Sequence, residues 1–182
     1  RTMWKLCVFA VSHLLVPSCV LAGDEDCAPL KSNERHWSCC KPVNLTIKEL
    51  SNNSRKCLEK VPPVPTIQPG DSLDTALKNR FSCLVECVFL HNGLLTEDKS
   101  LNKDAIMELY STNDKELAAV VDDAVTDCLD SHKEDVEESM DCKSGGLQFT
   151  NCVERTIFTN CPTSYWNASK ECADFKAKLV RC

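Results

Sequence analysis

The cysteines constrain this chain more than any other feature, because 14 of them occur in 182 residues. Cys7 and Cys19 fall in an apolar N-terminal stretch, and an even dozen follows it. An even dozen in an exported chain predicts six disulfides. Zinc is the competing explanation, but there is no Cys-x-x-Cys pair and few histidines are present, so we expect no metal and no other cofactor. The twelve are Cys27, Cys39, Cys40, Cys57, Cys83, Cys87, Cys128, Cys142, Cys152, Cys161, Cys172 and Cys182.

The N-terminal stretch has the pattern of a signal peptide. A short basic start at Met3-Trp4-Lys5 precedes an apolar run from Leu6 to Val16, and Val20-Leu21-Ala22 ends in a small residue. A membrane anchor is the alternative, but the run is short for a bilayer and is followed by Pro17. We therefore expect cleavage after Ala22, so that 1–22 is the signal peptide and 23–182 is one secreted, extracellular domain.

Loss of the signal peptide makes the chain more acidic. Removing Arg1 and Lys5 leaves 19 basic against 27 acidic side chains, a formal charge of -8. Such a surface repels phosphate backbones and anionic lipid, so we expect neither nucleic acid nor a membrane surface as a partner. No later stretch is apolar enough for membrane insertion.

Apolar residues recur at helical intervals along most of the chain, and no useful strand pattern appears. The clearest helix includes Phe81 to Gly93, where Cys83 and Cys87 lie one turn apart on the same face and so should bond to different elements. Adjacent Cys39 and Cys40, in an extended N-terminal arm, should likewise take separate partners. Helices are predicted over about 46–60, 70–93, 103–110, 113–128, 147–160 and 167–180, with an acidic, solvated loop at 134–141.

The cysteine spacing resembles that of insect odorant-binding proteins. Twenty-five residues separate Cys57 from Cys83, three separate Cys83 from Cys87, forty lead on to Cys128, and eight separate Cys152 from Cys161. The additional Cys142, the proline after Cys161 and the trailing Cys172 are similar to the Plus-C branch of that family. The resemblance covers nearly all of the chain after residue 22.

The resemblance implies a fold, a set of disulfides and a function. The fold is all-α, a compact disulfide-stapled bundle of six or seven helices around a ligand cavity. The implied disulfides are Cys57–Cys87, Cys83–Cys152 and Cys128–Cys161, with the N-terminal arm tied to the C-terminal segment and to the loop at Cys142. The implied function is a carrier of small apolar volatiles, odorants or pheromones, in the lymph of sensory hairs, without catalysis.

The apolar faces of the predicted helices supply the candidate binding residues. A small hydrophobic ligand is the expected partner, and an odorant receptor or a second copy of the chain are further candidates. A methionine can adapt its shape to different ligands, and one tyrosine hydroxyl can supply a hydrogen bond. The candidate ligand-binding residues are Leu84, Val88, Met107, Tyr110, Leu117, Val121, Phe149, Val153 and Ile157.

The sequence can also be compared with other classes of disulfide-rich helical protein. A phospholipase-type enzyme needs His and Asp soon after its double cysteine, whereas Cys39-Cys40 is followed by Lys41-Pro42-Val43. A plant-type lipid-transfer protein needs a Cys-x-Cys that is missing here. A secreted interaction protein that docks through its acidic exterior is the main alternative to the carrier, and a general carrier of lipids or other hydrophobic molecules with no olfactory role is another.

Overall fold

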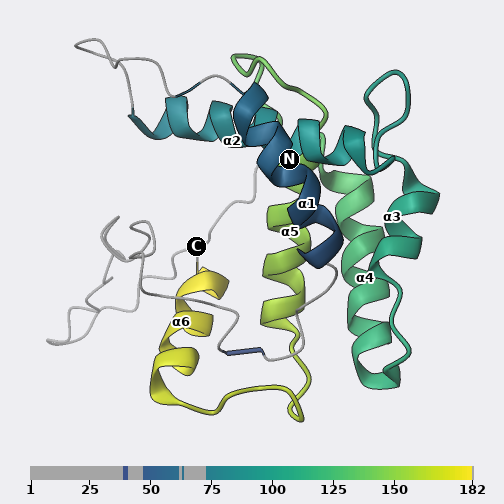
Figure 1. Ribbon diagram of the computed structural model, residues 1–182. Helices are drawn as coiled ribbons and strands as arrows, with labels where there is room; N and C mark the ends of the chain where they lie inside the picture. The colour runs from purple at the N-terminus through teal and green to yellow at the C-terminus, as the bar shows by residue number, and fades with distance from the viewer. Residues whose placement is uncertain (1–38, 41–46, 62, 64–72, 182) are drawn as a thin grey trace, which may run out of the picture.

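The computed structural model describes residues 39–40, 47–61, 63 and 73–181, and these form six α-helices with no strand beyond two isolated bridges. This confirms the predicted all-α fold (Figure 1). The predicted signal peptide, most of the N-terminal arm, Cys27 and Cys182 lie outside the described residues. The helices are α1 (Ile47–Lys60), α2 (Leu73–His91), α3 (Lys103–Tyr110), α4 (Lys115–Ser131), α5 (Gly146–Thr159) and α6 (Lys170–Arg181).

Short polar residues and glycines set the helix ends. The Asn102 side chain accepts the backbone N–H of Ala105 at the start of α3. Asp114 caps α4 and accepts the N–H groups of Glu116 and Leu117, so the cap lies one residue after the predicted Asn113. Gly93 has φ 71°, a left-handed conformation that favours glycine, directly after α2.

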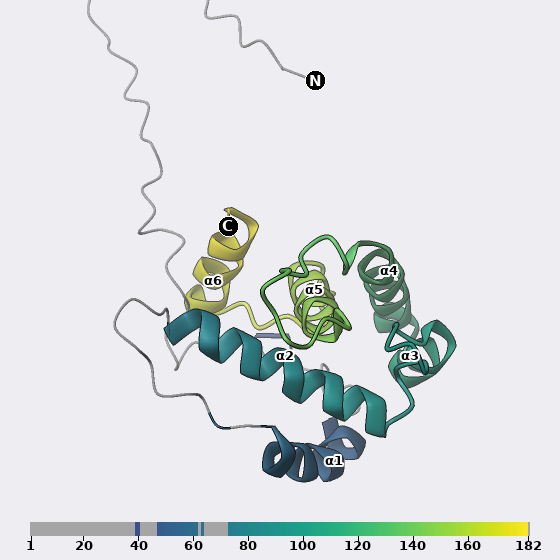
Figure 2. The same ribbon diagram turned by 90° about the horizontal axis from the view of Figure 1, so that it is seen from above.

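Helix α5 packs closely against more of the other helices than α2 does. It packs against α2, α4 and α6, whereas α2 packs against α1 and α5. Viewed from above, α2 crosses the bundle with α1 on one side and α5 on the other (Figure 2). Because α2 is covered on two sides, its apolar residues do not form a single stripe.

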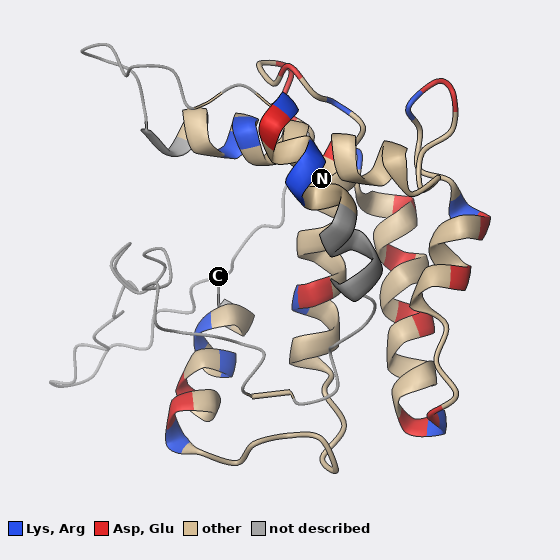
Figure 3. Cartoon of the chain, in the orientation of Figure 1, with Lys and Arg blue, Asp and Glu red and all other residues tan. Residues whose placement is uncertain are grey.

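The main apolar core lies between α2, α3, α4 and α5, and we call it the main cluster. Helix α4 shows how the sequence builds it, because Leu117, Val121 and Val125 are buried while acidic residues occupy the exposed face of the same helix (Figure 3). Its buried members are Phe89, Leu94, Leu95, Ile106, Leu117, Val121, Ala124, Val125, Cys128, Phe149, Val153 and Ile157.

A second, smaller cluster joins α6 to the end of α5. Phe158 makes edge-to-face contacts with Trp166 and Phe175, at ring-centroid distances of 5.4 and 4.9 Å. Cys39 and Cys40 are buried in this cluster, bonded to Cys172 and Cys161 respectively. The prediction of separate partners for the adjacent cysteines is confirmed, as is the tie from the arm to the C-terminal segment.

The other disulfides confirm one implied pair and correct two. Cys57–Cys87 is present, but Cys83 pairs with Cys142 and Cys128 pairs with Cys152. Cys152 packs against the main cluster beside α4, where Cys128 lies, and is therefore not available to Cys83. Numbered along the chain, Cys57, Cys83, Cys87, Cys128, Cys142 and Cys152 pair first with third, second with fifth and fourth with sixth. This is the pairing order that the resemblance implies, with Cys142 and Cys152 as the fifth and sixth cysteines in place of Cys152 and Cys161. The implied tie from the arm to the loop at Cys142 is wrong, because Cys142 pairs with Cys83.

Candidate ligand-binding site

The structure brings seven of the nine candidate binding residues together in the main cluster. Leu117, Val121, Phe149, Val153 and Ile157 are buried there, each no more than 3% exposed. The side chains of Met107 and Tyr110, from α3, are half-buried and pack against them. These seven residues come from three consecutive helices, α3, α4 and α5.

The two candidates on α2 are placed differently. Val88 is buried and Leu84 is half-buried, but neither belongs to the main cluster. The α2 residues that do reach it are Phe89 and, at its margin, Val85. Leu84 and Val88 therefore do not meet the other seven candidates, because this helix carries apolar residues around much of its circumference and its pattern does not single out one face.

Phe149 is the aromatic centre of the main cluster. Its ring meets Phe89 edge to face at 6.4 Å and Tyr110 edge to face at 6.0 Å. Burial, together with the negative charge of Glu154, raises the pKa of Tyr110 to about 12. The Tyr110 hydroxyl is thus a neutral polar group at the margin of an apolar interior, where it could orient a ligand.

Several residues of the main cluster are not among the nine candidate ligand-binding residues. Leu94 and Leu95 follow the end of α2, and the bridge between Leu95 and Leu101 closes the intervening turn so that both leucines point inward. The N–H of Asn102 also donates to the carbonyl of Leu94 at 2.9 Å. The sequence feature that could have indicated the burial of Leu94 and Leu95 is their position directly after Gly93, at the end of α2. The other buried members outside the nine candidates are Phe89, Ile106, Ala124, Val125 and Cys128.

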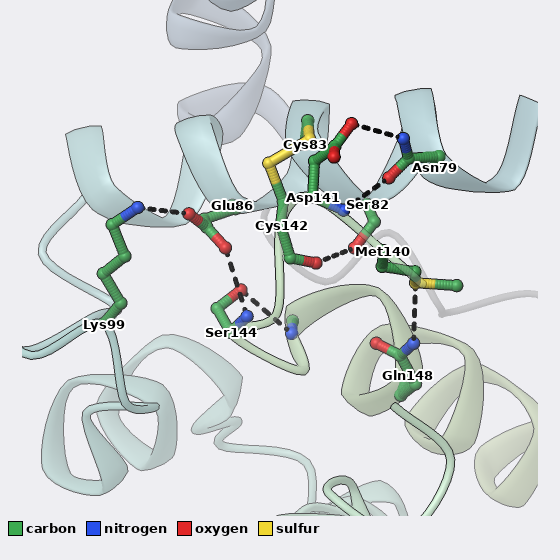
Figure 4. Close-up of a disulfide and its surroundings, with 11 residues drawn as sticks. Asn79, Ser82, Cys83, Glu86, Lys99, Met140, Asp141, Cys142, Ser144 and Gln148 are labelled. Atoms are coloured by element: carbon green, nitrogen blue, oxygen red, sulfur yellow. Dashed lines mark hydrogen bonds and ion pairs between the residues drawn. A yellow bond between two sulfur atoms is a disulfide. The ribbon is translucent and has the colours of Figure 1, made fainter. Parts of the chain in front are cut away.

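The segment before α5 is fastened to one face of α2 (Figure 4). Beside the Cys83–Cys142 disulfide, the Ser82 hydroxyl donates to the carbonyl of Cys142 at 2.7 Å. Asn79 donates to the Asp141 carboxylate and accepts the Asp141 N–H. These contacts hold the loop between α4 and α5 against α2, next to the main cluster.

Glu86 connects the same face of α2 to two loops. Its side chain is 8% exposed; one carboxylate oxygen lies 2.9 Å from Lys99 Nζ, and the other accepts the N–H of Ser144 at 3.1 Å. A buried carboxylate of this kind needs such partners to offset the loss of its hydration. Sequence spacing gave no sign of this connection, because the partners lie 13 and 58 residues away.

Two hollows of the surface are formed by described residues, and none of the nine candidates lines either of them. One, of about 610 Å³, lies between residues 134–137 and α5. The other, of about 800 Å³, lies on α6 beside Trp166, over whose ring Lys176 Nζ sits at 5.0 Å from the centroid. The nine candidate residues are thus separate from these two hollows.

One group of described residues has potential metal-ligand atoms close together. Potential ligand atoms of Cys57, Cys87 and His91 lie within 4.8 Å of one another. The two sulfurs are joined in a disulfide, which removes the thiolates that a metal would require, and only His91 remains. Among the described helices, none combines the length and the apolar character needed to cross a membrane.

Comparisons with known proteins agree with this architecture. The model of the PBP/GOBP family matches residues 43–156, which is more than half of the chain. General odorant-binding protein 67 of Anopheles gambiae is 30% identical over 107 residues. That alignment covers 54% of this chain and 52% of the relative, so the chain spans about half the length of the curated relative it matches. No solved structure matched the chain.

The family match includes α1, α2, α3 and α4 and most of α5. It therefore covers the three interlocked disulfides Cys57–Cys87, Cys83–Cys142 and Cys128–Cys152, together with all but Ile157 of the seven candidates that meet in the main cluster. On this evidence the chain belongs to the PBP/GOBP family, the insect odorant-binding proteins.

Proposed function

We propose that this protein is a secreted carrier that binds one small apolar molecule reversibly between α3, α4 and α5. The observation that carries the proposal is that six predicted apolar residues meet in or against one buried cluster, with the phenolic hydroxyl of a seventh candidate, Tyr110, at its margin. An interior with this composition suits a hydrophobic ligand with at most one polar group. Volatile odorants and pheromones have this chemistry.

The same composition argues for broad rather than narrow selectivity. Apolar contacts distinguish ligands that differ by one methylene by only about 1 to 3 kcal/mol. Met107 is half-buried against the cluster, and its flexible thioether can adjust to ligands of different shape. We expect micromolar affinities spread over many compounds, which fits a carrier better than an enzyme.

The two disulfides of the N-terminal arm support assignment to the Plus-C branch. Cys39–Cys172 and Cys40–Cys161 lie outside the three interlocked disulfides and add a covalently fixed C-terminal helix to the bundle. Residues 1–22, whose pattern is that of a signal peptide, support export, and we place the mature protein, residues 23–182, in an extracellular fluid such as sensory lymph. In this setting an acidic surface keeps the loaded carrier in solution.

The test is displacement of a fluorescent apolar probe by a panel of medium-chain and aromatic volatiles. In the Val121→Trp variant the new indole occupies the fully buried interior, and we expect the probe to lose at least ten-fold in affinity. Val180→Trp is the matched control, because it makes the same change at a side chain that is 67% exposed on α6 and should leave the affinity unchanged.

The binding proposal fails if the folded wild-type protein binds no probe and Val121→Trp unfolds as an overpacked core does. The interior would then be solid, and the protein would be better explained as a secreted interaction protein. Binding of long-chain lipids in preference to every volatile tested would indicate a general hydrophobic carrier. Met107→Trp provides a second position at which to distinguish these outcomes.

A further inference from the structure

Helix α6 carries an exposed apolar stripe in addition to its buried face. The buried face, with Cys172 and Phe175, belongs to the smaller cluster that joins α6 to α5. Ala173, Ala177 and Val180 recur at i, i+4 and i+7 on another side, and all three are exposed, Val180 to 67%. Among the described helices, α6 packs closely only against α5, at the edge of the bundle (Figure 2). A contiguous exposed apolar surface indicates a contact with a further segment or molecule.

The stripe lines the hollow of about 800 Å³ on α6, together with Trp166 from the connection between α5 and α6. The two charged side chains of the lining already have partners. Asp174 forms an ion pair with Lys170, and Lys176 lies over the ring of Trp166. The hollow therefore suits an apolar side chain better than a charged ligand.

The backbone at Cys39 runs directly beside the start of α6. Cys40 forms an antiparallel bridge with Trp166, and the N–H of Asn167 donates to the carbonyl of Cys39 at 2.7 Å. In an antiparallel pair, a step toward the N-terminus on one segment is a step toward the C-terminus on the other. Residues that precede Cys39 and continue this register lie opposite 168–169, where α6 is about to begin. The N-terminal arm is thus directed toward α6.

Two cysteines stand at the two ends of the segment that would run along α6. Cys27 and Cys182 are the members of the expected twelve that belong to none of the five disulfides. Cys182 directly follows α6, so a Cys27–Cys182 bond would fasten the arm at the end of α6 opposite to Cys172. From Cys172 to Cys182 a helix rises about 15 Å, whereas the extended chain from Cys27 to Cys39 reaches about 40 Å. The arm is long enough to follow the whole of α6.

The arm has apolar side chains near both of its ends. Ala28-Pro29-Leu30 lies near its start and Trp37 near its end, and the residues between them are polar or charged. On the path described above, Leu30 falls near the Val180 end of the stripe and Trp37 near the Trp166 end. The apolar parts of the arm therefore match the apolar parts of the hollow.

We propose that residues 27–38 occupy the hollow on α6 and cover its exposed stripe. Leu30 packs against Ala177 and Val180, and Trp37 packs near the start of α6. The arm shields this face of α6 from other apolar molecules, so that the ligands of the carrier are confined to the interior. This contact is independent of the apolar site between α3, α4 and α5.

The experiment is nuclear Overhauser NMR on the folded, disulfide-bonded protein comprising residues 23–182, with labelled methyl groups. We expect cross-peaks from the methyl groups of Leu30 to those of Ala177 and Val180, and from the Trp37 ring to α6. The cross-peaks should persist on dilution, because the arm and α6 belong to the same chain. Absence of every cross-peak between the arm and α6 would overturn the proposal.

Trypsin gives a second measurement, because Lys31 and Arg35 lie in the arm. Val180→Glu places a carboxylate on the stripe and should speed cleavage after these two residues at least about five-fold, since cleavage follows the population of the released arm. Leu58→Glu is the matched control, because it makes a similar change at a side chain that is 49% exposed on α1. Ala177→Glu repeats the test at a second position of the stripe. Equal cleavage rates in the wild type and all three variants would overturn the proposal.

A second copy of the chain and a free apolar ligand are the alternative occupants of the hollow. If the cross-peaks disappeared when a dimer dissociated, as followed by analytical ultracentrifugation, the stripe would belong to a partner copy and the proposal would be wrong. Binding of the fluorescent apolar probe should be weakened by Val121→Trp and unchanged by Val180→Glu. The reverse result would place the ligand in the hollow and overturn the proposal. Failure of the probe to bind at all would contradict the proposed carrier function but not the arm contact.

Discussion

At the scale of single residues, Phe149 is the largest fully buried side chain that the structure describes, and it touches two other aromatic rings. Replacing Phe149 with Ala should lower the free energy of unfolding by about 3 to 5 kcal/mol, because the change removes apolar contacts and leaves a cavity. Urea denaturation measures this loss. Phe81→Ala, at a side chain that is 53% exposed, is the matched control and should cost much less. Similar small losses in both variants would show that Phe149 lines open space rather than packed core.

Tyr110 gives a prediction at alkaline pH. Its pKa is raised to about 12 from an ordinary value of 10, so the neutral phenol is favoured in the folded state. The resulting stabilisation is complete below pH 10 and is lost as the pH rises from about 10 to about 12, because only the unfolded chain ionises readily in that interval. Tyr110→Phe should remove this part of the alkaline loss of stability.

Thermal unfolding followed across that pH interval measures the effect of Tyr110. The chain has two tyrosines, and the pKa of Tyr165 is also raised, in its case by a hydrogen bond to Asp114. Tyr165→Phe is therefore the necessary comparison, and ultraviolet absorbance of the phenolate assigns each titration. Ionisation of Tyr110 near its ordinary pKa in the folded protein would contradict its placement against Phe149.

At the scale of elements, the attachment of the 140–144 segment to α2 is the feature most open to test. The Cys83–Cys142 disulfide closes a loop with a sequence separation of 59 residues. Changing both cysteines to Ala should cost about 4 kcal/mol in the chain-entropy account of crosslinks. Hydrogen exchange should then rise mainly in the loop between α4 and α5, while α4 itself stays protected. Uniform exchange throughout the bundle would show that the disulfide supports the entire fold.

Glu86 joins this attachment to the turn before α3, and its two partners should differ in importance. Glu86→Ala leaves the buried Ser144 N–H without its acceptor, at a cost of about 1 to 3 kcal/mol. Lys99→Ala removes a cation whose side chain is 63% exposed, and should cost about 1 kcal/mol or less. Chemical denaturation of both single variants and the double variant measures the coupling. A larger loss for Lys99→Ala would contradict this order.

The elements themselves were largely predictable from the sequence, and their connections were not. Helix α3 was predicted over its full extent, and the ends of α2 and α5 differ from prediction by a few residues, because local caps and apolar spacing determine them. The partners of Cys83 and Cys128 were mispredicted. Which cysteine reaches which helix depends on the path of the loop at 132–145, and spacing alone does not determine that path.

The same division holds for the candidate site. Leu117, Val121, Phe149, Val153 and Ile157 were predictable because α4 and α5 each have one clear apolar stripe. Helix α2 has no such stripe, so its sequence did not show that Phe89, rather than Leu84 or Val88, lies in the main cluster. The hollow between residues 134–137 and α5 could not be predicted either, because it forms where a loop without periodic pattern lies against α5.

At the scale of the whole molecule, the covalent frame leaves two cysteines to account for. Ten cysteines are paired in the described part of the chain, and Cys27 and Cys182 are the remaining members of the expected twelve. We predict that they pair with each other, which would link the N-terminal arm to the end of α6. Peptide mapping of the mature protein without reduction should recover this link together with Cys83–Cys142, and should find no free thiol. A Cys83–Cys87 peptide would contradict the frame.

The Cys39–Cys172 disulfide has a consequence for how the protein resists digestion. Its sequence separation of 133 residues means that every peptide bond from residue 39 to residue 172 lies inside a closed covalent ring. A protease that cuts once within this ring opens the backbone but releases no fragment, so the cut protein keeps its full mass on a gel until a reductant is added. In a protease-containing fluid, molecules nicked once at an exposed loop would remain intact assemblies, able to hold a ligand after the chain itself has been broken.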